Sequence, residues 1–512
     1  MNLRIAPASY TTLITAGLVL VAIMLAVVVG VGGGLVGWFG QLFLLTVLVP
    51  ASLVALNYRF GLLALVVLMP FAGAQFIPKV GPLSAVNLLM VGVLTLVAVR
   101  LAMKRMLHGT VVLPIPTQFV LLYLLPITVS YLIGTMHLGE IAQHMLEEDG
   151  KRDTLRGYWI SSYFKNILFA LCGLSLAVAV VEYRNAKVFM YTALGSAVLY
   201  VLATAAMFSQ TSQTLEAAVY SRQMYSATGR HANSVGAMLL PIFAAALYMR
   251  EAAATRLGQW LLSGVALLLL GGLLLTGSRG AMLGTLVVAA IYLWQHRRLG
   301  TFLGAVLVAA VVLLASPAAV TDRLTMGLSD ISKLESSEDL GPGEQLTSGR
   351  LYLAKQLFPE VLKHPVLGNG MGSTRWSDYA KNGGPIAHPH NMYLLALLDL
   401  GIIGSVCVAA FVVYVLRLVR GLAREQALEP MLRAYFAGTF VGIVGYLVFA
   451  VSGGTPFPRI DQWFMWVGFG LALGCRVMIT GKVNAPGSLP TPGDTAVPKP
   501  SRRAAFWTPR PR

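Results

Sequence analysis

The sequence of residues 257–295 is LGQWLLSGVALLLLGGLLL, then TGSRG, then AMLGTLVVAAIYLWQ, so two apolar runs flank one short polar turn. Neither run contains an acidic or basic residue. A helix of about 20 apolar residues crosses the hydrocarbon layer of a membrane, which is roughly 30 Å thick. The first run is long enough for this, and the second is shorter. The stretch therefore predicts two membrane helices joined by a turn that contains Arg279.

The rest of the chain repeats this pattern. Of its 512 residues, 56% are hydrophobic and 12% are charged, whereas about a quarter are charged in a soluble domain. With a mean hydropathy of +0.72, this composition excludes a soluble globular protein. Because lipid cannot satisfy the open edge of a strand, we predict an all-α polytopic membrane protein. About 14 candidate spans are long and apolar enough; they lie near 11–30, 35–56, 60–77, 84–102, 117–135, 159–181, 187–208, 233–249, 257–276, 280–295, 300–316, 391–416, 434–452 and 461–479. Two are short and the third contains Pro70, so we expect about 12 to 14 transmembrane helices.

The positive charge of the chain is informative through its position. The formal net charge is +17, which in a soluble protein would suggest a nucleic-acid partner. If the N-terminus is inside, however, most Lys and Arg fall on the cytoplasmic side, in short loops and in the two termini, as the positive-inside rule requires. We therefore expect cytoplasmic N- and C-termini and no nucleic-acid partner. These loops contain Arg59; Arg100, Lys104 and Arg105; Arg184 and Lys187; Arg250 and Arg256; Arg297 and Arg298; and Arg417, Arg420, Arg424 and Arg433.

The predicted domains are a transmembrane domain over residues 1–480 and a tail over 481–512. The tail is rich in proline and basic residues, which is typical of disorder. The longest outer loop, near 317–390, is too long for a simple connection and contains a helix-like stretch over 350–362, so we expect it to fold over the membrane surface. Three cysteines lie inside apolar runs and predict neither a disulfide framework nor a zinc site; they are Cys172, Cys407 and Cys475.

Arginines in loops of the opposite, outer face are not explained by topology. Those that we single out are Arg222, Arg230, Arg279, Arg350 and Arg375. Arg279 is the most informative, because the helix after it has about 16 residues and is roughly 24 Å long, which places Arg279 at or below the outer headgroups. A guanidinium is a rigid fork of donors that matches phosphate oxygens. Each arginine taken singly has the alternative of snorkelling to lipid phosphates or pairing with a loop carboxylate. Their convergence on one face indicates an anion site.

The long outer loop ends in His388-Pro389-His390-Asn391, where the chain re-enters the membrane. Histidine titrates near neutral pH and can take a proton from a hydroxyl, so a histidine at the mouth of a helix bundle is a candidate general base. The alternatives are a hydrogen-bonded structural histidine or a metal ligand. No carboxylate lies beside the two histidines at ligand spacing, so the pattern does not predict a metal.

Other polar residues give weaker signals. In the outer loop near 135–158, Glu140 and His144 share a helical face; this spacing permits a metal site but is more typical of a solvated amphipathic helix. Asp399 lies inside a span, where we expect a buried, hydrogen-bonded acid. The sequence contains no Asp-x-Asp, His-Glu-x-x-His, Walker loop or Gly-x-Ser-x-Gly, which argues against a metal-dependent sugar transferase, a metalloprotease, an ATPase and an α/β-hydrolase.

The combination of motifs resembles the bacterial O-antigen ligase and polymerase superfamily. His390-Asn391, followed after nine residues by Gly401-Ile402-Ile403-Gly404, matches the superfamily pattern His-[Asn/Ser/Gln]-x9-Gly-x-x-Gly. The Ser278-Arg279-Gly280 turn agrees with it, as does Arg350 followed by His364-Pro365-Val366-Leu367-Gly368-Asn369-Gly370. Arg230-His231-Ala232-Asn233 is similar, more loosely, to a stretch that opens an earlier helix of the family. The resemblance in motifs runs over about 222–404.

This resemblance implies a membrane-embedded inverting glycosyltransferase of the GT-C type, acting on the periplasmic side of the bacterial inner membrane. The donor would be a glycan on undecaprenyl pyrophosphate, and the acceptor a sugar hydroxyl of a growing glycan or of lipid A-core, within a polysaccharide assembly pathway. His390 would be the catalytic base. Arg279 and Arg350 would bind the pyrophosphate, with Arg222 or Arg230 as a weaker third candidate and with support from Ser278, His388 and Asn391. Since arginines can stabilise a leaving diphosphate as a metal would, we expect no metal and no cofactor.

Two alternatives stay open. A polymerase and a ligase differ only in the acceptor; the sequence from Leu68-Met69-Pro70-Phe71 through Asn87-Leu88-Leu89 resembles the N-terminal part of exopolysaccharide polymerases and favours a polymerase. A protein of another class, a membrane transporter or lipid flippase, would place ionisable groups or broken helices near the bilayer midplane. Here the unusual charges cluster at one face instead.

Overall fold

The computed structural model describes residues 57–74, 77, 79–80, 83–108, 115–142, 154–209, 225, 228–296, 350–384 and 388–483. This part of the chain is helical apart from one short antiparallel hairpin, β1 (Lys79–Val80) and β2 (Leu83–Ser84), in which Lys79 pairs with Ser84. The spans predicted near 11–30, 35–56 and 300–316, and nearly all of the predicted tail, lie outside the described residues.

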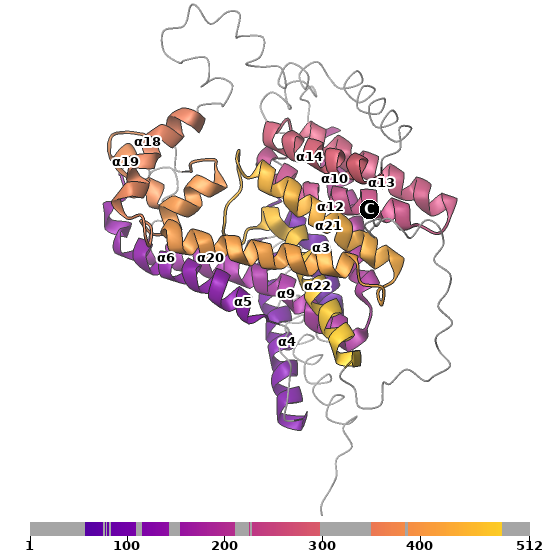
Figure 1. The fold of residues 1–512 in the computed structure, drawn as a ribbon. Coiled ribbons are helices and arrows are strands. Elements are labelled where there is room, and N and C mark those ends of the chain that lie inside the picture. Colours follow the sequence, from indigo (N-terminus) through magenta and orange to yellow (C-terminus); the bar gives the residue numbers. More distant parts are fainter. Residues whose placement is uncertain are drawn as a thin grey trace, which may run out of the picture.

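The helices follow in chain order and are arranged as Figure 1 shows. They are α3 (Tyr58–Leu68), η1 (Met69–Phe71), α4 (Ala85–His108), α5 (Thr117–Phe119), η2 (Val120–Leu124), α6 (Leu125–Met136), η3 (Leu138–Glu140), α8 (Leu155–Gly157), η4 (Tyr158–Phe164), α9 (Lys165–Tyr183), α10 (Ala186–Ser209), α12 (Ala232–Ala252), α13 (Arg256–Leu275), α14 (Arg279–His296), α18 (Arg350–Lys363), η7 (Ser373–Trp376), α19 (Asp378–Lys381), α20 (Met392–Ala423), α21 (Pro430–Phe449), η8 (Ile460–Gln462) and α22 (Trp463–Val483). The segments α5, η2 and α6 are continuous, as are α8, η4 and α9.

Within the described part of the chain, 9 helices are long and apolar enough to cross a membrane. Each corresponds to a predicted span, which confirms the all-α membrane fold. The predicted span 280–295 forms helix α14 but is not among the nine. The candidate near 60–77 is shorter than predicted, because α3 gives way at Pro70 to a turn of 3-10 helix and the apolar helix covers only Tyr58–Phe71. At 1.5 Å per residue it is about 21 Å long, shorter than the hydrocarbon layer of roughly 30 Å.

Helices α12 and α21 form the centre of the bundle, and glycines let their backbones touch. A Cβ atom added to Gly438 would lie 2.4 Å from the Cα atom of Ala245. One added to Gly442, four residues later, would lie 2.5 Å from the Cα atom of Pro241. Small residues spaced four apart are the usual device for close helix packing in membranes, where van der Waals contact replaces the hydrophobic effect. The contact fixes the direction of α21 through the bundle.

Helix α21 connects the two ends of the bundle. Before its first turn, Lys187 Nζ donates a hydrogen bond to Glu429 Oε2 at 2.8 Å. Beyond its last turn, the Ala450 carbonyl accepts a hydrogen bond from the Met392 amide at 2.9 Å. Loops predicted to be cytoplasmic therefore lie at the Glu429 end, and loops predicted to be outer lie at the Ala450 end.

The Glu429 end carries a cluster of charged side chains around Glu182. Arg100 forms an ion pair with this carboxylate, and Lys104 Nζ lies 3.5 Å from Oε2. The Tyr58 hydroxyl donates a hydrogen bond to the same carboxylate at 2.5 Å. Part of the basic charge at this end is thus neutralised inside the bundle. Which end faces the cytoplasm stays a prediction of the charge pattern.

Helix α20 is longer than the span predicted at 391–416 and is broken at Gly401, where φ is 64°. The loop that follows α18 supplies the backbone partners that the break would otherwise leave unsatisfied. The Ile402 amide donates to the Pro365 carbonyl at 2.8 Å, and the Asn369 amide donates to the Leu398 carbonyl at 2.7 Å. The segment after the break, about 33 Å long, spans a membrane by itself. The segment before it carries the outer loop.

Helix α18 begins at Arg350, which confirms the helix expected over 350–362. With η7 and α19 it forms a small unit at the upper left of Figure 1, beside the start of α20. Leucines and a valine on one face of α18 pack against the first segment of α20; the contact consists of Leu353, Leu357, Val361, Leu394 and Leu398. The outer loop is therefore folded onto the bundle over its described residues.

Asp399 holds this unit in place. Its Oδ1 atom accepts hydrogen bonds from the Ser373 hydroxyl at 2.7 Å and from the Ser373 amide at 3.1 Å. Its carbonyl accepts a third bond, from the Ser130 hydroxyl in α6, at 2.7 Å. The side chain is 1% exposed, so the expectation of a buried, hydrogen-bonded acid is confirmed. Its role is to tie η7, α20 and α6 together.

Candidate active site

The Ser278-Arg279-Gly280 turn begins α14 at the Ala450 end of the bundle. The Ser278 hydroxyl accepts a hydrogen bond from the Ala281 amide at 3.4 Å and so caps the helix. A Cβ atom added to Gly280 would lie only 1.8 Å from Ser452 Oγ. Glycine at this position lets the start of α14 dock directly on the turn after α21. Arg279, the first residue of α14, is thereby fixed beside residues 449–452.

The histidine motif reaches the same turn from the other side. Asn391 is the N-cap of α20, and its side-chain oxygen accepts hydrogen bonds from the Tyr393 and Leu394 amides at 2.9 and 3.1 Å. The Met392 amide donates to the Ala450 carbonyl, and the Tyr393 hydroxyl donates to the Leu447 carbonyl at 2.7 Å. Asn391 therefore has a structural role in the motif, which is to start the helix and orient the residue before it.

The structure thus brings Gly280, the residue after Arg279, and Met392, two residues after His390, to one turn, although they are far apart in the sequence. His390 is exposed, and its φ angle is 51°, in the left-handed region that non-glycine residues rarely adopt. Such a conformation persists only where the surroundings enforce it, and it is found most often at functional sites. The geometry is consistent with His390 as the base and Arg279 as an anion ligand.

His388 lies under His390, with the two ring centroids 5.3 Å apart. Its Nδ1 atom accepts a hydrogen bond from the His390 amide at 2.9 Å. Its Nε2 atom is buried and has no hydrogen-bond partner among the described residues. Burial, followed by the charges of His390 and Arg459, lowers the pKa of His388 to about 3. His388 is therefore a neutral ring and not a second base.

Arg230 lies just before α12 and points toward η1, where its Nε atom donates to the Pro70 carbonyl at 3.4 Å. Burial is the main cause that lowers its pKa to about 10, so the guanidinium stays charged at neutral pH. Asp461 opposes this shift and Arg459 adds to it. Arg230 is a structural cation of the outer end that also contributes to the positive field there.

Arg459 is a further candidate for the site that the sequence motifs do not indicate. It lies in the short loop between α21 and η8 and is exposed, with no hydrogen bond or ion pair of its side chain to the residues that the structure describes. Its charge acts on His388, Arg230 and Tyr446, which places it over the same end of the bundle. Arg459 lies between the predicted spans 434–452 and 461–479, on the outer face of the predicted topology, so the positional criterion used for the other outer arginines applies to it as well.

Two of the remaining predicted arginines, Arg350 and Arg375, lie in the unit formed by α18, η7 and α19. Arg350 starts α18, whose packing on the first segment of α20 sets it on the outer side of the bundle. Arg375 lies in η7, where its carbonyl accepts a hydrogen bond from the Ala142 amide at 3.2 Å. Arg222 lies outside the described residues.

The loop that follows α6 supports the α18 to α19 unit. His137 stacks on Trp376, with ring centroids 5.8 Å apart, and its Nδ1 atom lies 2.9 Å from Glu140 Oε1. Lys381 Nζ donates to Glu140 Oε2 at 3.2 Å. His137 and then Lys381 lower the pKa of Glu140 through these bonds. Glu140 is engaged in this clamp, and His144, its predicted helical neighbour, lies outside the described residues.

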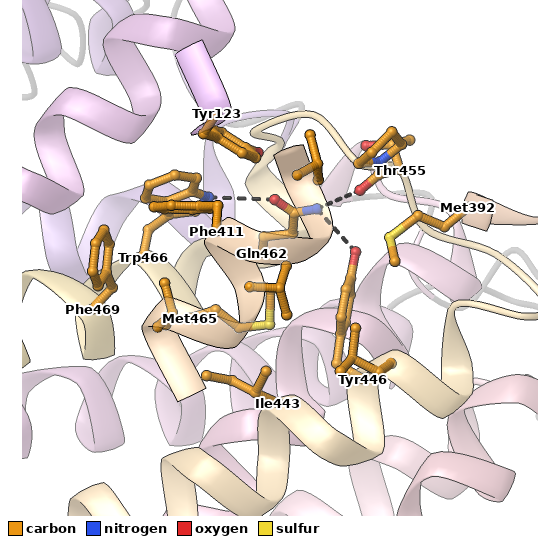
Figure 2. A pocket seen from close by; sticks show the side chains of 15 residues that line it. Tyr123, Met392, Phe411, Ile443, Tyr446, Thr455, Gln462, Met465, Trp466 and Phe469 are labelled. Carbon is orange, nitrogen blue, oxygen red and sulfur yellow. Dashed lines mark hydrogen bonds between the residues drawn. The ribbon is translucent and has the colours of Figure 1, made fainter. Parts of the chain in front are cut away.

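An apolar cavity of about 90 Å³ lies between α20, α21 and α22. Met392, next to the histidine motif, lines one part of it, and Phe411 and Phe469 line another. Figure 2 shows Gln462 as the main polar group at this cavity, with its amide fully used. It donates to the Tyr446 hydroxyl at 2.9 Å and to the Thr455 carbonyl at 2.7 Å, and its oxygen accepts from Trp466 Nε1 at 3.3 Å. The cavity therefore suits an apolar occupant.

The fold and the site together define an all-α polytopic membrane protein with arginines and a histidine gathered at one end of its helix bundle. Residues 264–409 match the family model described as O-antigen ligase, which supports the resemblance to the O-antigen ligase/polymerase superfamily. The matched region contains Arg279, Arg350, His390 and the Gly401 break. No match to an individual curated protein was found.

Proposed function

We propose that the chain is an inverting, metal-independent glycosyltransferase that transfers a glycan from undecaprenyl pyrophosphate to a sugar hydroxyl on the periplasmic side of the bacterial inner membrane. The domain match supports an enzyme of the O-antigen ligase/polymerase type in general. We further propose that the acceptor is another lipid-linked glycan, so that repeat units of O-antigen or exopolysaccharide are polymerised. Attachment to lipid A-core is the alternative within the same class.

The observation that carries this proposal is the convergence of Arg279 and His390 on the 449–452 turn. Gly280 docks on Ser452, and Met392 is bonded to Ala450, so both motifs are held by the same short segment. A base and a cation held together at one end of a membrane bundle suit a reaction between a hydroxyl and a lipid diphosphate.

In the proposed reaction His390 takes the proton of the acceptor hydroxyl as its oxygen attacks the anomeric carbon of the donor. The bond between that carbon and the diphosphate oxygen breaks, and the configuration at the carbon inverts. The electron pair leaves with undecaprenyl pyrophosphate, and the proton on His390 returns to solvent. A histidine in this role contributes roughly 100- to 10,000-fold in rate.

The leaving diphosphate needs its charge stabilised, and the outer arginines supply this. We assign direct contact to Arg279 and Arg350, while Arg222 and Arg230 are further candidates. Arg459, exposed on the same end, adds to the field that attracts an anionic donor. Preorganised cations in a site of low dielectric stabilise developing charge by several kcal/mol, as a metal ion would.

We assign the apolar cavity beside Met392 to the isoprenoid part of the donor. It is small, so it would hold only a short piece of the chain nearest the diphosphate. The rest of the chain would lie in the bilayer.

The test is reconstitution of the purified full chain in vesicles with a lipid-linked glycan, with and without lipid A-core. Mass spectrometry of the products is expected to show longer glycan on the undecaprenyl carrier. Glycan on lipid A-core instead would establish the ligase alternative. Movement of the lipid-linked glycan across the bilayer without any new glycosidic bond would contradict the enzyme and favour a flippase.

A further inference from the structure

The hydrogen bond between His388 and His390 fixes which nitrogen of His388 carries the proton. The His390 amide can only donate, so Nδ1 of His388 must be the acceptor, at 2.9 Å. A neutral imidazole that accepts at one nitrogen carries its proton on the other. Nε2 of His388 is therefore an N–H donor.

That donor has nothing to bind within the described part of the chain. The Nε2 atom is buried and lacks a hydrogen-bond partner there. A buried donor without a partner is destabilising, and native structures contain few of them. The cost is recovered when a ligand brings an acceptor atom to the site.

The surroundings indicate the charge of that ligand. Burial and the neighbouring charges of His390 and Arg459 keep His388 neutral, so it can offer its proton in a hydrogen bond but cannot take up a second one. Gly280, the residue after Arg279, docks on the 449–452 turn, to which Met392 also binds, so the donor lies in a region of positive charge. An anionic oxygen is the acceptor that such a region favours, and hydrogen bonds to charged oxygens are the stronger kind.

We propose that the Nε2–H group of His388 donates a hydrogen bond to a non-bridging oxygen of the diphosphate in the lipid-linked donor. This assignment rests on the proposed function. It gives the two histidines of the motif different tasks: His390 receives the proton of the acceptor hydroxyl, and His388 holds the leaving group. A neutral donor suits this task because its proton stays in place while the diphosphate departs.

The experiment compares two variants that separate the ring nitrogens. In His388→Gln the longer side chain places an amide N–H near the Nε2 position, whereas in His388→Asn the amide reaches only the Nδ1 position, where it can still accept from the His390 amide. We would measure the affinity of the full chain in detergent for farnesyl diphosphate by titration calorimetry. His388→Asn is expected to bind about 10- to 100-fold more weakly than wild type, and His388→Gln within about threefold of it.

His364→Asn is the matched control, because His364 is exposed and its carbonyl, not its ring, bonds Gly368 at 2.9 Å. Wild-type affinity in His388→Asn would overturn the proposal. So would equal losses in the Asn and Gln variants accompanied by a lower unfolding temperature, which indicate a structural histidine. If the KM for the acceptor rises while the affinity for farnesyl diphosphate is unchanged, the Nε2–H group of His388 binds the acceptor sugar instead. This result would also overturn the proposal. If wild type neither binds farnesyl diphosphate nor transfers glycan, the proposed function itself fails.

Discussion

His390 stands in a left-handed backbone conformation that its neighbours enforce. Its amide is bound by His388, and the residue after it, Asn391, caps α20 with two hydrogen bonds. The His388-Pro389-His390-Asn391 motif could be recognised from the sequence because it is defined by residue types and spacing. The neutral state of His388 and the presence of Arg459 beside it could not, since both depend on which loops meet at the end of the bundle.

The low pKa of His388 predicts a loss of stability in acid. Folding lowers this pKa from about 6.5 to about 3, so between these values the unfolded chain binds more protons than the folded one. Acidification from pH 7 to pH 5 is therefore expected to destabilise the folded chain by about 2 kcal/mol through this residue. The temperature of thermal unfolding in detergent should fall less steeply on acidification for His388→Gln than for the wild type. Parallel curves for the two proteins would contradict the assignment.

The charge of Arg459 predicts an effect on the donor but not on the chemical step. Because its side chain is exposed and acts at a distance, Arg459→Gln is expected to raise the KM for the lipid-linked donor about three- to tenfold, with kcat nearly unchanged. Raising the salt concentration should shrink the difference. Arg424→Gln, an exposed arginine at the opposite end of the bundle, is the control. Equal effects of the two substitutions would show that Arg459 has no specific part in the site.

Among the helices and loops, one backbone contact at the break in α20 accounts for glycines in two sequence motifs. Gly401 of the Gly-x-x-Gly motif and Gly368 of the loop after α18 lie against each other; a Cβ atom on Gly401 would be 2.4 Å from the Gly368 nitrogen. Apolar runs and their lengths predicted the helices themselves well. The break was not predicted, because its unsatisfied backbone groups find partners in a loop distant in sequence, and hydropathy does not report such pairing.

Gly401→Ala is expected to destabilise the protein by more than about 2 kcal/mol, since alanine is strained at φ 64° and its Cβ atom would collide with the loop. The release of the loop should also expose residues 350–384 to protease. Gly421→Ala is the matched control in the same helix, because nothing lies within 4 Å of the added atom. A Gly401→Ala protein with wild-type unfolding temperature and protease resistance would refute this account of the break.

Over the whole molecule, the two ends of the bundle differ in how their basic residues are paired. The end that contains Glu182 and Glu429 gathers basic residues with acidic partners, whereas the Ala450 end gathers Arg230, Arg279 and Arg459 around the histidines. The basic residues therefore form two groups, a larger one that the positive-inside rule explains and a smaller one at the site. The first could be predicted from loop positions alone. The second became a cluster only when the folded chain brought its members together.

This division predicts the accessibility of single cysteines from the two sides of the membrane. In intact cells a membrane-impermeant maleimide should label Arg459→Cys and leave Arg424→Cys unlabelled until the membrane is opened. Of the native cysteines, Cys172 and Cys475 are fully buried, and the half-buried Cys407 is replaced by serine in both variants to remove its background. Labelling of both variants from the same side would contradict the predicted topology.

In the proposed reaction, His390 removes the acceptor proton at a site where arginines, and no metal, hold the leaving diphosphate. The most direct measurement is the rate at which the purified full chain couples glycan transfer to release of undecaprenyl pyrophosphate in excess EDTA. Wild type is expected to remain active, and His390→Ala to lose at least about 100-fold while it still binds the donor. Wild-type turnover by His390→Ala, or activity of the wild type that stops in EDTA and returns with a divalent metal, would contradict the claim.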